Sequence, residues 1–173
     1  MRKVRRIVTG HNERNRSTVL FDGPPPHGGG MAAELWATDQ VPAQNAGSGE
    51  ATDRPMRLAP PPQGSLFRYF EVHPESAMAA MDEKTRQSVV RNMFASIGAE
   101  DALVDTSRHA MMHKTHTVDY VVVLSGNVTL LLDDGEVDLE PLDAVVQRGT
   151  NHAWANRSGA PARVAFVLIA GSA

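Results

Sequence analysis

The sequence predicts a mainly β protein built from antiparallel sheets, with one helix and an N-terminal arm. Six short runs of β-branched and other apolar residues follow one another between residues 119 and 170, with turn residues between them. Closely spaced strands with tight turns are typical of antiparallel sheets that close into a sandwich or barrel. One stretch, residues 82–97, repeats its apolar residues at helical spacing instead.

The chain begins with two β-like runs, Val4–Thr9 and Ser17–Asp22, which flank a polar loop suited to a hairpin. Prolines end the second run, because proline has no amide hydrogen to donate to a sheet. Residues 23–64 are rich in proline, glycine and small residues, and only Ala33–Thr38 has the pattern of a strand there. We expect a long arm that is either disordered or laid across a partner subunit.

The middle of the chain contributes a strand and the helix. Ser65–His73 is rich in aromatic and β-branched residues, and Pro74 ends it. The helix runs from Asp82, a suitable N-cap, to Ile97, and Gly98 follows as the residue that ends it. Its apolar stripe contains a methionine and is compatible with a ligand groove. We interpret the stripe as a helix packing against a core, which is the more frequent case.

The runs after the helix are the predicted barrel strands. Ser125-Gly126 and Asp134-Gly135 are predicted hairpin turns, the latter of type I′. At 173 residues we expect one structural domain. Within this domain, we expect residues 1–64 to pack on a barrel formed by residues 65–173, with a helix inserted at about residues 82–97. The predicted strands are Asp119–Ser125, Asn127–Asp133, Glu136–Glu140, Asp143–Gln147, His152–Asn156 and Arg163–Ala170.

The composition excludes several kinds of function. With 17 Lys plus Arg against 20 Asp plus Glu, the formal charge of -3 gives no electrostatic reason to expect nucleic acid or a membrane surface as partner. The absence of cysteine excludes disulfides, thiolate catalysis and cysteine-ligated zinc. No apolar run reaches the ~18–20 residues of a membrane span, and no signal peptide is recognisable, so we expect a cytoplasmic protein. A short basic cluster is compatible with a nucleic-acid arm, but a solvated strand face is favoured: Arg2, Lys3, Arg5 and Arg6.

Polar residues able to bind a metal ion stand at both ends of the stretch 113–156. Alternate residues of a strand share a face, so each end would point three side chains into the barrel, provided that no bulge intervenes before Asp119. Two histidines and a carboxylate converging there would form a facial site with open positions, suited to iron(II), manganese, nickel or zinc. The inward sets are His113, Thr115 and Asp119 on one strand, and His152, Trp154 and Asn156 on another.

These residues resemble the two motifs of the cupin superfamily, in particular the small single-domain cupins. The first motif is glycine, five residues, His-x-His, three or four residues, Glu, six residues and Gly. The second ends in Pro-x-Gly, two residues, His, three residues and Asn. The resemblance covers about residues 108–170 and implies an antiparallel double-stranded β-helix, the cupin or jelly-roll barrel. The matching positions are Ser107, His113-x-Thr115, Asp119 and Gly126, then Gln147-x-Gly149, His152 and Asn156.

The departures from the motifs concern the metal ligands above all. Thr115 stands where the family usually has a second histidine, and a hydroxyl is a poor ligand for these metals. Asp119 is one methylene shorter than the usual glutamate, and Leu142 replaces the glycine of the usual Pro-Gly-Asp turn. The resemblance therefore implies a reduced metal site of His113, Asp119 and His152. Thr and Asp-Tyr at these positions are similar to a subset of small cupins.

Each candidate also has a structural interpretation. His113 alone would be a core histidine, but His152 at cupin spacing favours the ligand role. Asp119 has three possible roles: a metal ligand, a general base, or simply the first residue of a strand. Trp154 packs the barrel wall and is placed to stack on a substrate. His116 faces away from His113 by alternation and would enter the site only through a bulge.

Three further residues have simpler interpretations. Asn156 is expected to be a structural hydrogen-bonding residue, and Tyr120 is expected to face away from the site. Arg68 lies between apolar neighbours on its strand. It is either a surface charge or an inward arginine suited to clamp a carboxylate.

The resemblance implies a metal-dependent enzyme that acts on a small organic acid or carbonyl compound by lyase-type chemistry: dehydration, decarboxylation or isomerisation. Asp119, His116 and Trp154 are the candidate catalytic residues. Such small cupins are similar to lyases and tailoring enzymes of secondary metabolism. The alternatives are an iron-dependent dioxygenase and a non-catalytic domain that binds a small ligand. We also expect a homodimer, since single-domain barrels of this type usually pair through sheet faces or edges.

Overall fold

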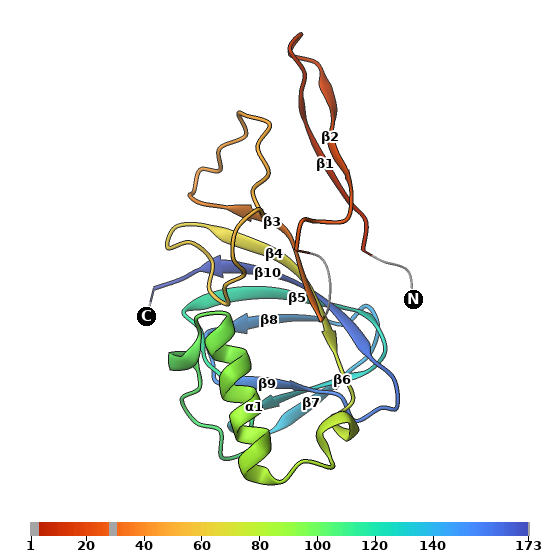
Figure 1. Ribbon diagram of the computed structural model, residues 1–173, viewed down its shortest axis with the longest axis vertical. Helices are drawn as coiled ribbons and strands as arrows, with labels where there is room; N and C mark the ends of the chain where they lie inside the picture. The colour runs from red at the N-terminus through yellow and green to blue at the C-terminus, as the bar shows by residue number, and fades with distance from the viewer. Residues whose placement is uncertain (1–3, 28–30, 173) are drawn as a thin grey trace.

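A computed structural model describes residues 4–27 and 31–172 (Figure 1). The described chain forms antiparallel sheets with one α-helix, which confirms the predicted mainly β fold. A five-stranded and a three-stranded sheet make the barrel, and a separate two-stranded hairpin projects from it. Arg2 and Lys3 of the predicted basic cluster lie outside the described residues.

The larger sheet has the spatial order β3-β4-β10-β5-β8, and every neighbouring pair is antiparallel. Inward and outward side chains alternate along its strands, as the sequence pattern predicted. The predicted strand at residues 33–38 is thus part of the main sheet. The strands are β3 (Ala32–Thr38), β4 (Ser65–Val72), β10 (Ala162–Ala170), β5 (Thr117–Ser125) and β8 (Ala144–Arg148).

The smaller sheet has the order β7-β6-β9, with β7 (Glu136–Leu139), β6 (Val128–Leu132) and β9 (His152–Ala155). The chain passes from β5 to β6 through Gly126, whose φ is +72°. A Cβ at this position would lie 2.9 Å from the Cα of Ala162, so only glycine fits the turn.

The core lies between these two sheets. Trp154 of β9 packs against the buried side chains of both, and burial of each large apolar side chain contributes roughly 1.5–3 kcal/mol of stability. The facing layers of this core come from Val121, Val123, Val164, Phe166 and Leu168 on one side and Val128, Leu130 and Leu139 on the other.

The helix α1 (Glu83–Ser96) lies beside the space between the two sheets (Figure 1). Short 3₁₀ turns, η1 (Glu75–Met78) and η2 (Glu100–Ala102), flank it. Asp82 is its N-cap, as predicted, because its carboxylate accepts a hydrogen bond of 2.9 Å from the Thr85 amide. In the part of the chain that the structure describes, no helix has the length and apolarity needed to cross a membrane.

The strands β1 (Arg6–His11) and β2 (Ser17–Gly23) form the projecting hairpin. Within the described residues it pairs with no other strand. The buried Arg6 ties its base to the loop after β3, donating to the carboxylate of Glu50 at 2.8 Å and to the hydroxyl of Thr52 at 3.2 Å. The hydrogen bond from Arg6 lowers the pKa of Glu50 to about 2.

Candidate functional site

A cavity of about 230 Å³ lies between the larger sheet, β9 and α1. Most of its wall is apolar, and four of the chain's eight methionines contribute to it, namely Met31, Met56, Met93 and Met111. The polar side chains that line the cavity are Arg68, His113, Thr115, Asp119 and His152. The inward direction predicted for His113, Thr115 and Asp119 is therefore confirmed.

A backbone bridge brings His113 and His152 together. The amide of each residue donates to the carbonyl of the other, both at 2.9 Å, and the ring centroids lie 4.4 Å apart. The Nδ1 atom of His113 lies 2.9 Å from the Met111 carbonyl, and that of His152 lies 2.9 Å from the Thr150 carbonyl. Because a carbonyl only accepts, each Nδ1 carries the proton and each Nε2 is left as an acceptor.

Both histidines are held neutral by their surroundings. Burial, with a contribution from His113, lowers the pKa of His152 to about 3. Burial also lowers the pKa of His113, against a smaller opposing effect of its hydrogen bond to the Met111 carbonyl. Two neutral rings lie side by side without repulsion and can each accept a hydrogen bond at Nε2.

Asp119 of β5 is a buried carboxylate, only 4% exposed, with an unpartnered oxygen. Its Oδ1 has no hydrogen-bond partner among the described residues. Burial raises the pKa of Asp119 to about 6, against the opposing influence of the Thr117 hydroxyl and the Arg68 charge. An unpaired carboxyl group that titrates near neutrality inside a cavity is a candidate for acid–base chemistry.

Trp154 and Thr115 complete the polar end of the wall. Trp154 stands edge-on to the rings of His152 and Phe166, with centroid distances of 5.9 and 5.4 Å. The Thr115 hydroxyl shares a hydrogen bond of 2.7 Å with the hydroxyl of Thr117. Trp154 is thus placed to contact a ligand through its ring, as predicted, and Thr115 is engaged within the protein.

Three residues lie outside the cavity. His116 is exposed just before β5, while its neighbours Thr115 and Thr117 are buried, so its side chain does not turn inward. The structure therefore does not support the catalytic role predicted for His116. Asn156 is structural, as expected, because its amide donates to the Val72 carbonyl at 2.7 Å. Tyr120 lies on the outer face of the larger sheet, also as expected.

Arg68 points inward from β4, but its charge is already paired. Its guanidinium forms an ion pair of 2.7 Å with Glu34 and donates to the backbone carbonyls of Arg57 and Leu58. A register irregularity between Glu34 and Trp36 accompanies the burial of Glu34 beside Ala33. The sequence prediction missed this pair, because strand alternation gives no signal for it.

The helix α1 also contributes to the site through Met93, Phe94 and Ile97. The Phe94 ring lies 5.2 Å from the ring of His113. The interpretation of the helical stripe as core packing is right for Val90 and incomplete for these three residues. The methionine in the stripe was the available signal for a ligand surface.

The predicted metal ligands do not form a three-ligand group as they lie. Among residues 4–27 and 31–172, no three His, Asp or Glu side chains are placed to hold a metal ion together. His113 and His152 make a pair of nitrogen donors, and Asp119 lines the cavity separately. A catalytic metal usually has three protein ligands. Metal binding therefore stays a prediction for this chain.

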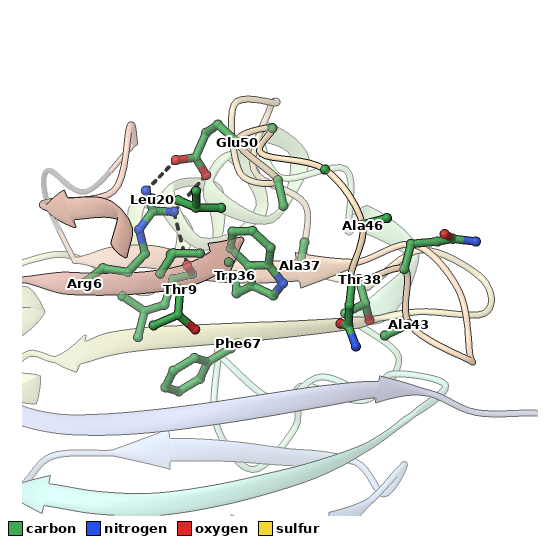
Figure 2. Close-up of a pocket in the computed structure, with 18 of the residues that line it drawn as sticks. Arg6, Thr9, Leu20, Trp36, Ala37, Thr38, Ala43, Ala46, Glu50 and Phe67 are labelled. Atoms are coloured by element: carbon green, nitrogen blue, oxygen red, sulfur yellow. Dashed lines mark hydrogen bonds and ion pairs between the residues drawn. The ribbon is translucent and has the colours of Figure 1, made fainter. Parts of the chain in front are cut away.

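A second hollow, of about 1100 Å³, lies between the β1–β2 hairpin, β3 and the loop that follows β3 (Figure 2). Trp36 and Phe67 line it, and Figure 2 shows Arg6 and Glu50 paired at one side. Because these two charges neutralise each other, we assign the acid–base site to the barrel cavity and treat this hollow as an open groove.

Several known proteins are similar to this chain in sequence. No protein-family model matches the chain. Phomopsin biosynthesis cluster proteins C' and D of Diaporthe leptostromiformis are each 50% identical to it over 62 residues, which is 35% of this chain and 33% of either relative. The chain therefore spans about a third of the length of these relatives. The cupin-domain-containing oxidoreductase fogC of Aspergillus ruber is 27% identical over 177 residues, covering 96% of this chain and 72% of fogC.

Among solved structures, a Cupin 2 conserved barrel domain protein from Salinispora arenicola aligns with 68% of this chain and 71% of its own, at 14% identity and a TM-score of 0.38.

Three findings agree on the family. The fold is an antiparallel barrel of two sheets, and both cupin motifs lie on it at the predicted strands. The motif histidines His113 and His152 meet at the cavity. Nearly the whole chain aligns with a cupin-domain-containing relative. The fold, the two motifs and this relative support the resemblance of the chain to the cupin superfamily.

Proposed function

We propose that the chain is a proton-transfer enzyme of lyase or isomerase type, acting on a small carbonyl compound in the barrel cavity. The observation that supports it is the contrast between Asp119 and the histidine pair. Asp119 titrates near neutrality, whereas His113 and His152 stay neutral and present Nε2 acceptors. Groups with separated pKa values in one cavity are a recurring basis of acid–base catalysis at neutral pH.

In this proposal the two histidines bind the substrate and Asp119 transfers the proton. The Nε2 atoms of His113 and His152 accept hydrogen bonds from a substrate hydroxyl and orient it. The Asp119 carboxylate takes a proton from the carbon next to the substrate carbonyl. It returns that proton to another carbon in an isomerisation, or to the departing hydroxyl in a dehydration that releases water. Neither reaction needs an oxidant or a reductant.

The apolar wall supports this chemistry by keeping water away from Asp119. Trp154, Phe166 and Leu168 line the cavity together with residues of α1. A carboxylate that loses its hydration shell holds its proton more strongly, as the raised pKa of Asp119 shows. It is then a stronger base toward a weakly acidic C–H group.

The relatives suggest the metabolic setting. Two of them are named for phomopsin biosynthesis and a third for the biosynthesis of oryzines in Aspergillus oryzae. We therefore propose that the substrate is an intermediate of secondary metabolism. This setting was predicted from the resemblance to small cupins.

Hydrogen exchange at carbon tests the proposal without knowledge of the natural substrate. The probe is 7-hydroxy-2-tetralone, an uncharged two-ring hydroxyketone with exchangeable α-hydrogens, incubated in deuterated buffer with protein treated with a chelator. We expect the protein to accelerate deuterium incorporation, with an inflection near the Asp119 pKa of about 6. Asp119→Asn should slow the exchange by about 10²-fold or more, the usual contribution of one general base.

Two outcomes would contradict the proposal. One is exchange by Asp119→Asn at the wild-type rate. The other is complete loss of exchange on chelation with recovery on adding iron, which would show that a metal ion is required.

The names of the relatives favour one alternative, an oxidoreductase. Three are named cupin-domain-containing oxidoreductases, including srdD of Neurospora crassa and virC of Hypocrea virens. Consumption of oxygen during turnover, together with stoichiometric iron in protein purified without added metal, would support this reading. A protein that binds 7-hydroxy-2-tetralone but neither exchanges its hydrogens nor consumes oxygen would be a binding domain.

A further inference from the structure

The charged residues that line the barrel cavity bear on which molecules can enter it. Among the described lining residues, Arg68 is the one arginine or lysine, and Asp119 is the one carboxylate. An organic acid would need an available cation, because a carboxylate that loses water without a partner is strongly destabilised.

Arg68 is not such a cation. Its Nη2 atom lies 2.7 Å from the Glu34 carboxylate, and both side chains are almost fully buried. The same atom also donates to the Arg57 carbonyl, and Nη1 donates to the Leu58 carbonyl at 3.5 Å. Its Nε is buried and has no partner within the described chain. The guanidinium is therefore neutralised and held by the protein itself.

The remaining polar groups of the cavity favour a ligand that donates hydrogen bonds. His113 and His152 use their Nδ1 protons on backbone carbonyls and offer Nε2 acceptors to the cavity. The Oδ1 atom of Asp119 is unpartnered. A second carboxylate beside Asp119 would meet a like charge in an apolar surrounding, where repulsion is strong.

The apolar wall is suited to rings. Thioether side chains adapt to irregular shapes and make favourable contacts with aromatic faces, and four methionines line this cavity. Phe70, Phe94, Trp154 and Phe166 add aromatic surface. The volume of about 230 Å³ is below the ~300–1,000 Å³ of clefts that hold drug-sized ligands, which suits one or two rings.

We infer that the cavity selects an uncharged one- or two-ring compound carrying a hydroxyl or carbonyl group, and that the Arg68–Glu34 pair is what makes it reject organic acids. This inference rests on the proposed function and names the substrate class of the same cavity. Of the two predicted substrate classes, it keeps carbonyl compounds and excludes organic acids. Decarboxylation is then excluded as well, because it needs an acid, and dehydration and isomerisation remain.

Two probes of the same shape and different charge test this selection. They are 2-naphthamide, which is neutral, and 2-naphthoate, which is an anion at pH 8. Binding to chelator-treated protein is measured by calorimetry and by quenching of tryptophan fluorescence. We expect the amide to bind at least about tenfold more tightly, since one unfavourable charge contact in a poorly solvated site exceeds that factor.

The matched variants are Glu34→Gln and Glu50→Gln. Glu34→Gln keeps the shape of the side chain and releases the Arg68 charge, so naphthoate affinity should rise by about tenfold or more. Glu50→Gln removes a carboxylate that is paired with Arg6 at the groove and does not line the cavity, so it should leave the ratio unchanged. Thermal melts of both variants verify that they are folded.

The inference is overturned if the wild-type protein binds naphthoate as tightly as naphthamide, if it binds neither, or if folded Glu34→Gln keeps the wild-type ratio. The readout is separate from catalysis. Asp119→Asn can lose hydrogen exchange while the protein still discriminates between the probes, and the reverse outcome is equally distinguishable.

Discussion

Asp119 is held in a state that lowers the stability of the fold. The pKa of its carboxyl group is raised from 3.8 to about 6 by burial. Between these values the folded chain keeps a proton that the unfolded chain releases, so stability falls as the pH rises through this window. Above the window the ionised carboxylate costs about 2–3 kcal/mol, at 1.36 kcal/mol for each pKa unit.

We therefore predict that Asp119→Asn stabilises the protein while slowing the proposed hydrogen exchange. At pH 8 the free energy of unfolding should rise by about 2 kcal/mol, and at pH 4 the variant and the wild type should be nearly equal. Urea denaturation at the two pH values measures this difference. The control is Asp138→Asn, at an exposed carboxylate that accepts a hydrogen bond of 2.7 Å from the Thr129 hydroxyl, where no gain is expected. A loss of stability in Asp119→Asn at pH 8 would show that Asp119 has a structural role instead.

Leu142 is a second residue that lowers stability, in this case through its backbone conformation. It occupies the usual glycine position of the turn between β7 and β8, with φ at +80°, and its side chain is 85% exposed. For a residue with a Cβ, a left-handed backbone conformation costs roughly 1–2 kcal/mol. The structure shows no side-chain burial that offsets this cost.

Leu142→Gly should therefore raise the free energy of unfolding by about 1 kcal/mol, part of the relieved strain being offset by the greater freedom of glycine in the unfolded chain. Leu142→Ala is the matched control, because alanine removes the exposed side chain but keeps the Cβ. Equal stabilisation by both substitutions would assign the effect to the side chain and disprove backbone strain as its cause. Thermal unfolding with circular dichroism is sufficient to compare them.

The helix α1 lines the cavity, so the stability of this helix should affect the shape of the cavity. Its N-terminus depends on Asp82, whose carboxylate accepts hydrogen bonds from the amide and the hydroxyl of Thr85 at 2.9 and 2.8 Å. Asp82→Ala should lower the free energy of unfolding by about 1 kcal/mol, the usual value of an N-cap. Because Met93 and Phe94 line the cavity, it should also weaken binding of 2-naphthamide.

The control for this prediction is Asp82→Ser, which keeps an oxygen acceptor at the N-cap. It should retain most of the stability and the ligand affinity. Unchanged affinity in Asp82→Ala, despite reduced stability, would show that the cavity wall does not depend on the first turn of α1.

The predicted elements show what a sequence pattern can specify. Turn residues such as Gly126 and Gly135, and the alternation in β5 and β10, predicted the strands because these signals are local. The pairing of Glu34 with Arg68 was not predictable, because it depends on a local irregularity in β3 and joins residues 34 positions apart. The motif spacing correctly predicted that His113 and His152 lie together. Whether Asp119 lies close enough to the two histidines to share a ligand with them depends on side-chain distances, which the spacing of residues in the sequence does not specify.

The outer face of the larger sheet carries a row of apolar residues across all its strands. Trp36, Phe67, Val167, Tyr120 and Val146 are cross-strand partners in register. Phe67, Tyr120 and Val146 are 43%, 51% and 60% exposed. The row continues into the groove beneath the β1–β2 hairpin, where Trp36 and Phe67 form part of the lining (Figure 2). Exposed apolar surface of this extent usually marks an interface.

We propose that a second copy of the chain is the partner that covers this face. Five strands spaced about 4.8 Å apart, with an average length of about 26 Å, give a sheet face of roughly 600 Å² per copy, near the ~800 Å² that each partner buries in a stable complex. Two identical rows can pack on each other about a two-fold axis. The hairpin, which pairs with no other strand in the described chain, would gain a partner at the same time, and isolated hairpins are only marginally stable.

The homodimer predicted from the sequence can be tested by measuring the mass of the protein in solution. Light scattering at micromolar concentration should give twice the chain mass of 18.7 kDa for the wild type. The double variant Tyr120→Lys, Val146→Lys places two charges in the row and should give the single chain mass, because each lysine would have to be desolvated at the interface. Val137→Lys is the matched control, since Val137 is 50% exposed on β7 of the other sheet and should leave the dimer intact. A wild-type monomer would refute the dimer, and a double variant that still dimerises would place the interface on another face of the barrel.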